Sequence, residues 1–252
     1  AGDGSAIFLN SEQQSITDAF ITSYDSGDRA PCLIHGVTGS GKTEVYMALI
    51  DHVLLQGKQA IVLIPEIALT YQTVSRFYSR FGNRICVMHS RLSAGEKCDQ
   101  FERARNGETD IMIGARSALF TPFPNLGLII IDEEQEHTYR SESAPRYSAH
   151  EVARQRAAEN GALLLLASAT PSTESFYAAQ HGRTQLVRLT QRYGGNPLPT
   201  VQIVDMRAEL AAGNPREISL SLEDAIRRNL DAGKQTILLL NRRGYQTMAQ
   251  CE

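Results

Sequence analysis

The chain has 252 residues, of which 42% are hydrophobic, and its formal net charge is −3 at pH 7. This length and apolar content suffice for a sizeable core and for one large domain or two smaller ones. No stretch approaches the ~18 consecutive apolar residues of a membrane span, and the N-terminus AGDGSAIFLN lacks the pattern of a signal peptide. We therefore expect neither a membrane span nor secretion, and the cytoplasm is the default location.

Charge and cysteine content leave the ligand class open. A net charge near zero neither supports nor excludes DNA, because a nucleic-acid contact needs only locally clustered Arg and Lys. The four cysteines are scattered without C-x-x-C spacing, which suits a reduced compartment and gives no metal site by itself. We expect most of them to be small core residues: Cys32, Cys86, Cys98 and Cys251.

Apolar runs alternate with segments of helical period along most of the chain. A first helix is expected over SITDAFITS, with Ser11 as its N-cap. Helical spacing recurs at Val45, Ala48, Leu49 and Val53, and again at Val74, Phe77 and Phe81. Unbroken apolar runs indicate strands buried on both faces, and their alternation with helices predicts a parallel sheet covered by helices. These runs lie at 32–36, 59–65, 84–90, 110–114, 126–134 and 162–170.

The pattern changes after Arg188. The segment TQRYGGNPLPT (190–200) has paired glycines and two prolines, which indicate an irregular connection and a domain boundary. We expect a first α/β domain at 1–189. Residues 190–252 then form a linker and the beginning of a second α/β domain, with strands over VQIVDM (201–206) and 235–241 and a helix around 221–230.

The strongest local motif is GVTGSGKT, from Gly36 to Thr43, which fits G-x-x-x-x-G-K-[ST]. It follows a predicted strand and precedes a predicted helix, so backbone N–H groups and the helix N-terminus face an anion. A plain glycine-rich turn is the alternative, and the strand context together with Lys-Thr disfavours it. Lys42 is expected to meet the β- and γ-phosphates of ATP, and the Thr43 hydroxyl to bind Mg²⁺. The expected nucleotide-binding residues of the loop are Gly36, Thr38, Gly39, Ser40, Gly41, Lys42 and Thr43.

Two adjacent acidic residues can complete the site that this loop begins. LIIIDEEQ (128–135) places Asp132 at the end of a buried run, where its carboxylate can hold the metal. The adjacent Glu133 can orient or deprotonate an attacking water. Glu134 is expected to be structural or a neighbour of the site.

Three motifs then occur in the order found in superfamily 2 helicases, namely the Walker A loop, Asp132-Glu133 as Walker B, and Ser168-Ala169-Thr170. From about Leu9 to its end, the chain resembles the PriA family of primosomal replication-restart helicases. The segments that carry this resemblance are GVTGSGKTEVY (36–46), LIPEIALTYQ (63–72), HSRLSAGEK (89–97), IMIGARSALFTPFPNLGLIIIDEE (111–134), PRYSAHEVA (145–153), ASATPSTES (167–175) and LLLNRRGY (238–245).

The resemblance implies a RecA-like P-loop lobe followed by part of a second lobe. It implies an ATP- and Mg²⁺-dependent 3′-to-5′ DNA helicase that acts on single-stranded and forked DNA, with primosome and single-strand-binding proteins as partners. Gln13 matches a family glutamine suited to adenine, and Ser168 and Thr170 would couple the phosphate site to DNA. The family's N-terminal DNA-binding region would lie upstream of this chain.

Two polar stretches are candidates for nucleic-acid contact. Arg116 and Ser117 follow a strand and can contact a phosphate, although Arg116 suits a surface ion pair equally well. Residues 137–153 mix aromatic and basic side chains, which is typical of single-strand contacts and resembles the family's aromatic-rich coupling loop. The alternative is a solvated loop whose tyrosines pack on the domain. The candidates in this stretch are Tyr139, Arg140, Arg146 and Tyr147.

The sequence also departs from the family. The usual D-E-E-H is Asp132-Glu133-Glu134-Gln135 here, so the catalytic set Lys42, Asp132, Glu133 and Gln135 contains an amide that donates and accepts hydrogen bonds but does not titrate. Cys251 stands where the family's first zinc ligand would be, and zinc is expected in the full-length protein only. The family's arginine finger would lie beyond Glu252, so we expect this chain to bind ATP better than it hydrolyses it.

Other classes remain open at this point. One is a P-loop ATPase or kinase with a small-molecule substrate, and another is a nucleotide-sensing or DNA-binding module without catalysis. Within the helicases, an RNA-directed enzyme also fits, because no stretch distinguishes deoxyribose from ribose.

Overall fold

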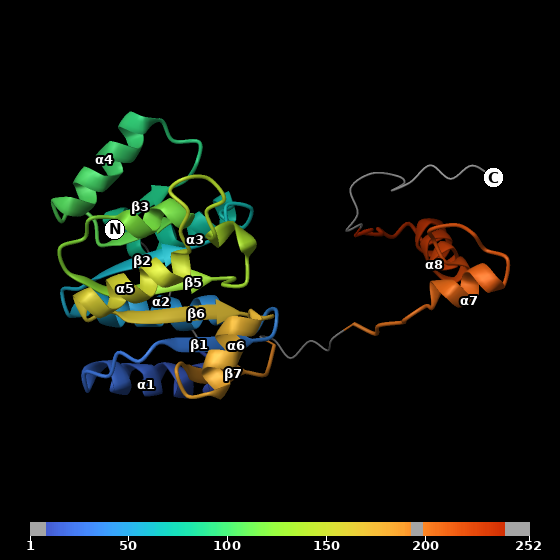
Figure 1. The fold of residues 1–252 in the computed structure, drawn as a ribbon, viewed down its shortest axis with the longest axis horizontal. Coiled ribbons are helices and arrows are strands. Elements are labelled where there is room, and N and C mark those ends of the chain that lie inside the picture. Colours follow the sequence, from blue (N-terminus) through green and yellow to red (C-terminus); the bar gives the residue numbers. More distant parts are fainter. Residues whose placement is uncertain (1–8, 193–198, 240–252) are drawn as a thin grey trace. The chain divides into compact units, whose positions relative to one another are not determined.

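The computed structural model describes residues 9–192 and 199–239, and the chain divides into two compact units, Ala1–Pro197 and Leu198–Glu252. The first unit is built on a seven-stranded sheet in the order β3-β4-β2-β5-β6-β1-β7 (Figure 1). Every neighbouring pair of strands is parallel. The predicted parallel α/β sheet is therefore confirmed.

Six of the strands match the predicted apolar runs: β1 (Cys32–Gly36), β2 (Gln59–Leu63), β3 (Ile85–Met88), β4 (Ile111–Gly114), β5 (Leu126–Asp132) and β6 (Leu163–Ser168). The seventh, β7 (Gln185–Leu189), was not predicted. It pairs with β1 at the edge of the sheet and its side chains are only partly buried, so it lacks the continuous apolar run that marks the others.

Helices cover both faces of this sheet. The segments are α1 (Ser11–Asp25), α2 (Lys42–Leu55), α3 (Tyr71–Phe81), α4 (Ala94–Arg105), α5 (Ala149–Asn160) and α6 (Thr173–Gln180), with 3₁₀ turns η1 (Gly82–Arg84), η2 (Arg116–Phe120) and η3 (His137–Tyr139). One buried cluster joins the sheet to α1, α2 and α3, and a second joins its other face to α4 and α5. Within β5, Leu128 and Ile130 enter the first cluster while Ile129 and Ile131 enter the second, as the period of a strand requires.

The predicted start of α1 is wrong by one residue. Asn10, not Ser11, is the N-cap: its side chain accepts a hydrogen bond from the Gln13 N–H at 2.8 Å, and the Gln13 side chain accepts from the Asn10 N–H at 2.9 Å. Asn10 has extended backbone angles, whereas Ser11 is already helical. This reciprocal capping box fixes where the helix begins.

The second unit contains α7 (Met206–Ala211) and α8 (Leu220–Asp231). The predicted helix is confirmed by α8, but the two predicted strands are wrong within the described residues: 201–205 and 235–239 have no strand assignment. A strand needs a ladder of hydrogen bonds to a neighbour, and residues 199–239 supply none. Their apolar side chains are instead exposed, as at Ile203 and Ile237. NRRGY and Cys251 lie outside the described residues.

Two further expectations concern the core and the membrane. Cys32 and Cys86 are buried in strands, as expected, whereas Cys98 is exposed on α4. None of the helices described in residues 9–192 and 199–239 has the length and apolar character needed to span a membrane.

Close packing at the carboxyl end of β4 gives a first prediction. A Cβ at Gly114 would lie 2.3 Å from the Met88 main-chain oxygen and 2.9 Å from the Ala118 Cβ. Because backbone cannot move aside as a flexible side chain does, we expect Gly114→Ala to lower the free energy of unfolding by about 1–3 kcal/mol, measured by urea denaturation. Gly95→Ala on α4 is the control: its Cβ meets open space, and we expect a gain of about 0.5–1 kcal/mol. Equal stabilities for the two variants would contradict this packing.

Candidate active site

The glycine loop joins β1 to α2 as a tight backbone turn. Gly39 and Gly41 have φ of 78° and 77°, in the left-handed region that favours glycine. Gly41 is the N-cap of α2 and has no side chain to occupy the free N–H groups of the first turn. A Cβ at Gly41 would lie 2.2 Å from the Gln13 Nε2. The loop therefore presents backbone donors and the positive end of a helix to an anion.

Lys42 and Ser40 complete this cradle. The Lys42 Nζ donates to the Gly36 main-chain oxygen at 3.0 Å, which holds the ammonium over the loop while the residue is largely buried. The Ser40 hydroxyl is buried and has no hydrogen-bond partner among the described residues. Exposed N–H groups, a held cation and an unpaired hydroxyl are the groups that a phosphate chain would satisfy.

The predicted magnesium ligands share one partner. Thr43 Oγ1 and Asp132 Oδ2 lie 3.0 Å and 2.9 Å from the Tyr46 hydroxyl. Burial raises the pKa of the Asp132 carboxyl, and the Tyr46 hydrogen bond opposes that rise. A hydroxyl and a carboxylate are the hard oxygen ligands that suit Mg²⁺, so the residues present fit this ion. When bound, Mg²⁺ would neutralise phosphate charge.

Glu133 follows Asp132 in a sparsely populated conformation. Its φ of 46° is the one positive value of a non-glycine residue in the described chain, and such angles cost about 1–2 kcal/mol. This backbone turn directs Glu133 into the same cavity of about 340 Å³ as the glycine loop. The residues that line it are Thr38, Gly39, Gly41, Lys42, Thr43, Glu44, Arg76, Asp132 and Glu133.

A chain of hydrogen bonds leads from Glu133 to the third motif. The Gln135 Nε2 donates to Glu133 Oε2 at 2.8 Å, and the Gln135 Oε1 accepts from the Ser168 hydroxyl at 2.6 Å. Ser168 Oγ in turn accepts from the Thr170 N–H at 2.9 Å. Because β6 lies between β5 and β1, Ser168 is next to both the acids and the glycine loop. The amide at 135 thus makes one donated and one accepted bond without titrating.

Gln13 lies behind the glycine loop. Its buried side chain donates from Nε2 to the Ser40 main-chain oxygen at 2.8 Å, and its Oε1 accepts from Asn10. The capping box of α1 therefore also supports the phosphate cradle. A contact between Gln13 and adenine stays a prediction.

Glu134 anchors the loops around the site. Its buried carboxylate accepts from the Ser172 N–H at 2.7 Å, the Ser172 hydroxyl at 3.0 Å and the Ser175 hydroxyl at 2.8 Å, and it lies 3.2 Å from His150 Nε2. Burial alone would raise the pKa of this carboxyl, but the bonds from His150, Ser172 and Ser175 outweigh burial and lower it. The end of β5 is thereby tied to the first turns of α5 and α6.

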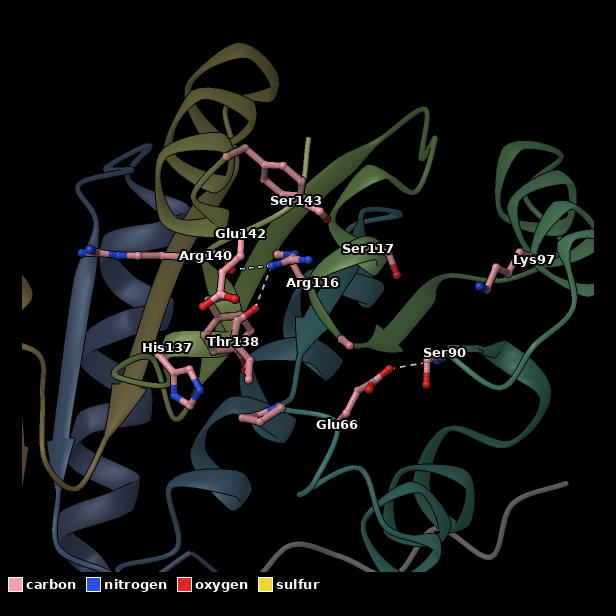
Figure 2. A pocket seen from close by; sticks show the side chains of 14 residues that line it. Glu66, Ser90, Lys97, Arg116, Ser117, His137, Thr138, Arg140, Glu142 and Ser143 are labelled. Atoms are coloured by element: carbon pink, nitrogen blue, oxygen red, sulfur yellow. Dashed lines mark hydrogen bonds between the residues drawn. The ribbon is translucent and has the colours of Figure 1, made fainter. Parts of the chain in front are cut away.

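A surface pocket is lined by residues that follow β2, β3, β4 and β5 in the chain (Figure 2). Arg116 lies near its middle, and Lys97 extends from α4 toward it (Figure 2). The Arg116 Nη1 donates to the main-chain oxygens of Thr138 at 3.1 Å and Arg140 at 2.6 Å. Ligand crevices of parallel sheets lie at this edge. The lining residues are Pro65, Glu66, Ser90, Lys97, Ala115, Arg116, Ser117, His137, Thr138, Tyr139, Arg140, Glu142, Ser143 and Tyr147.

The residues predicted to contact nucleic acid lie in different environments in the structure. Tyr139 is 1% exposed, and its hydroxyl donates to the Asp132 main-chain oxygen at 2.7 Å, so it links the loop to Walker B. The Tyr147 ring lies 5.3 Å from the Arg116 guanidinium and lines the pocket. The Arg140 side chain turns away toward Glu174 on α6, at 3.2 Å. Arg146 donates to the Glu142 main-chain oxygen at 3.2 Å and is not among the lining residues.

Two residues near the cradle have contacts that the sequence did not predict. Tyr46 bridges Thr43 and Asp132, and its position one turn after Thr43 was the available signal. Arg192 donates from Nε to the Thr38 main-chain oxygen at 3.1 Å. Because the two residues are far apart in the sequence, no local pattern predicts this contact.

Known proteins with similar sequences and folds identify the family of this chain. The family model described as "DEAD/DEAH box helicase" matches residues 11–177, which is most of the first unit. The chain belongs to the DEAD/DEAH box helicase family. Of the curated proteins, Replication restart protein PriA from Bacillus subtilis (strain 168) is 46% identical over 96% of this chain and 30% of its own length. PriA from Treponema pallidum (strain Nichols) is 42% identical over 96% of the chain and 36% of its length.

These identities confirm the resemblance of this DEAD/DEAH box helicase chain to PriA, and the chain spans about a third of the length of these relatives. Among solved structures, RecG bound to a three-way DNA junction has a TM-score of 0.54 and 24% identity, over 73% of this chain and 24% of its own. The helicase MrfA bound to DNA and AMPPNP has a TM-score of 0.52 and 20% identity, over 75% and 27%. These two likenesses show the fold.

Zinc is not tested by the described part of the chain. Residues 9–192 and 199–239 contain no cluster of three or more His, Cys, Asp or Glu that could hold a metal ion. Cys251, the predicted zinc ligand, lies outside these ranges. Its role in the full-length protein stays a prediction.

The bonds of Glu134 give a second prediction. Glu134→Ala would remove the partner of the buried Ser175 hydroxyl and of the partly buried Ser172 N–H, so we expect the free energy of unfolding to fall by about 2–4 kcal/mol. Glu134→Gln keeps some of these bonds and should lower the free energy of unfolding by less than Glu134→Ala does. Both are measured by chemical denaturation at pH 7. The control is Glu151→Gln, an exposed acid on α5, for which we expect a change within about 0.5 kcal/mol.

The difference in stability between the natural chain and Glu134→Gln should depend on pH, because the fold lowers the pKa of Glu134. Because the folded-state pKa of Glu134 lies below its unfolded value of about 4.3, the stabilisation is present above that value. It is lost as the pH falls through the folded-state pKa. We therefore expect the gap between the natural chain and Glu134→Gln to narrow below about pH 4. A gap that stays constant down to the lowest pH at which both variants fold would contradict a bonded carboxylate.

Proposed function

We propose that this chain is the nucleotide-binding part of an ATP-dependent DNA helicase that acts in replication restart with 3′-to-5′ polarity. One observation carries the proposal. The Tyr139 hydroxyl bonds to the main chain of Asp132, so the wall of the surface pocket is attached to the residue expected to hold Mg²⁺. The relatives, which are named Replication restart protein PriA, support the biological role.

In the proposed reaction, the glycine loop binds the phosphates and Lys42 stabilises the charge on the transferred phosphoryl group. Thr43 and Asp132 hold Mg²⁺. Glu133 orients or deprotonates the attacking water from its place in the same cavity. The buried Tyr139 side chain lies against Asp132 and shields one side of the site from water.

Two connections lead away from this chemistry, one toward α6 and one to the pocket. The first is the chain from Glu133 through Gln135 to Ser168 and Thr170. The second is the Tyr139 bond to Asp132, reinforced by the edge-to-face contact of the Tyr139 ring with His150 at 5.9 Å. A change in the position of the acids after hydrolysis would therefore be transmitted to both α6 and the pocket loop.

The pocket is proposed to bind the backbone of single-stranded or forked DNA. Arg116 uses Nη1 to brace the loop, which leaves other N–H donors of its guanidinium for a phosphate. Lys97 adds a second cation among the lining residues, and the partly exposed Tyr147 ring offers a stacking surface. Glu66 and Glu142 also line the pocket, so affinity depends on where the phosphates lie relative to these acids.

Further parts of the proposal concern the whole protein. Primosome and single-strand-binding proteins are its proposed partners, and zinc is proposed for the region around Cys251. We also propose that the 252-residue chain binds ATP but hydrolyses it slowly, since the family's arginine finger comes from the second lobe, and such a residue is worth about 10³–10⁵ in rate.

Arg116 provides the test of the DNA-binding face. Arg116→Ala should weaken binding of a fluorescent oligo(dT) several-fold and reduce the slope of log K against log salt by about 0.7, the value for one phosphate contact on a single strand. Fluorescence anisotropy at several salt concentrations measures both. Arg183→Ala removes an exposed arginine outside the pocket and should change neither quantity.

A second comparison separates the two sites. Lys42→Ala should abolish binding of a labelled ATP analogue and leave oligo(dT) binding nearly intact. Arg116→Ala should weaken oligo(dT) binding several-fold and leave binding of the ATP analogue nearly intact. Failure of matched DNA and RNA oligonucleotides alike to bind, together with normal ATP binding, would favour a P-loop ATPase with a small-molecule substrate. Stronger binding of the RNA would redirect the proposal to an RNA helicase.

A further inference from the structure

Tyr46 distinguishes the extended motif GVTGSGKTEVY from a minimal phosphate loop, and nothing in the phosphate-loop pattern requires it. It lies one helical turn after Thr43 on α2, and its side chain is 1% exposed. Its hydroxyl is 3.0 Å from Thr43 Oγ1 and 2.9 Å from Asp132 Oδ2. One buried oxygen therefore connects the two expected magnesium ligands, which come from α2 and from the end of β5.

The direction of these two hydrogen bonds is set by chemistry. A phenol carries one proton, and an ionised carboxylate accepts only. Tyr46 therefore donates to Asp132 and accepts from the Thr43 hydroxyl. The Thr43 proton is then directed at Tyr46, which leaves a lone pair of Thr43 Oγ1 for a metal ion.

The ring of Tyr46 is held in place by stacking. The Phe77 ring from α3 lies 6.4 Å away and within 14° of parallel, and Phe81 stacks on Phe77 at 6.3 Å. Phe77 is fully buried, so the stack is part of the core. Because phenylalanine at position 46 would fill the same ring space, packing alone does not explain a hydroxyl here.

We propose that Tyr46 is a positioning residue for the magnesium site. Its hydroxyl holds the Thr43 hydroxyl and the Asp132 carboxylate on one shared partner before the ion binds. This inference rests on the proposed function in one respect, namely that the glycine loop binds a nucleotide with Mg²⁺. Glu44 and Arg76, which also line the cavity, form an ion pair with one another and do not contact this hydroxyl.

The test is Tyr46→Phe, which removes only the hydroxyl. Binding of N-methylanthraniloyl-AMPPNP to the 252-residue chain is measured by fluorescence, first in EDTA and then across a Mg²⁺ titration. We expect the Kd in EDTA to stay within about twofold and the Mg²⁺ concentration for half-maximal enhancement to rise about tenfold, as the loss of one charge-assisted hydrogen bond predicts. Tyr78→Phe, at a partly exposed tyrosine on α3, should change neither value.

Two further variants exclude a merely structural effect. Phe77→Leu keeps the hydroxyl but removes the stack, so the Mg²⁺ requirement should rise here too, by less than in Tyr46→Phe. In the double variant Thr43→Ala with Tyr46→Phe, the two effects should be less than additive, because Tyr46 acts partly through Thr43. Circular dichroism melting shows whether each variant folds.

Several outcomes would overturn the inference. An unchanged Mg²⁺ requirement in Tyr46→Phe removes the positioning role. If Tyr46→Phe weakens nucleotide binding equally with and without Mg²⁺, Tyr46 contributes only to the packing of the core. If the natural chain itself binds the analogue without any response to Mg²⁺, the proposed magnesium site fails, whereas a normal response with an unaffected Tyr46→Phe refutes only the inference.

Discussion

The end of β5 is the point on which the other parts of the site depend. The Asp132 carboxylate accepts a hydrogen bond from the Tyr46 hydroxyl, and its main-chain oxygen accepts one from Tyr139. Glu133 lines the phosphate cavity. Glu134 binds residues at the starts of α5 and α6. A buried carboxylate is costly unless hydrogen bonds compensate it. The bonds to the Asp132 and Glu134 carboxylates, together with the Tyr139 bond to the Asp132 main chain, position the nucleotide site, the starts of α5 and α6 and the pocket loop relative to each other.

Much of this arrangement could be predicted from sequence. The buried strands are marked by unbroken apolar runs, because both faces of a parallel sheet are covered. The glycine loop and the Asp132-Glu133 pair are local patterns whose chemistry is fixed by residue type and spacing. Gln135 was expected to donate and accept, and it does so toward Glu133 and Ser168. These features depend on short segments, which a sequence displays directly.

The features that were missed depend on contacts between distant segments. Edge strand β7 lacks the full burial that marks the others, and the predicted strands at 201–206 and 235–241 have no neighbour to pair with in the described residues. Tyr139 looked like a DNA-contact residue by composition, but its burial against Asp132 makes it a link. Tyr46 and Arg192 acquire their roles only when the fold brings their partners together.

The central claim is that the nucleotide site and the pocket are coupled through the end of β5. The direct test compares the oligo(dT) affinity of the natural chain and of Tyr139→Phe, each with and without Mg²⁺ and AMPPNP. We expect the nucleotide to change the DNA affinity of the natural chain at least about fivefold, as allosteric couplings do. In Tyr139→Phe this factor should approach one while each separate affinity stays within about twofold. A variant that keeps the coupling of the natural chain would contradict the claim.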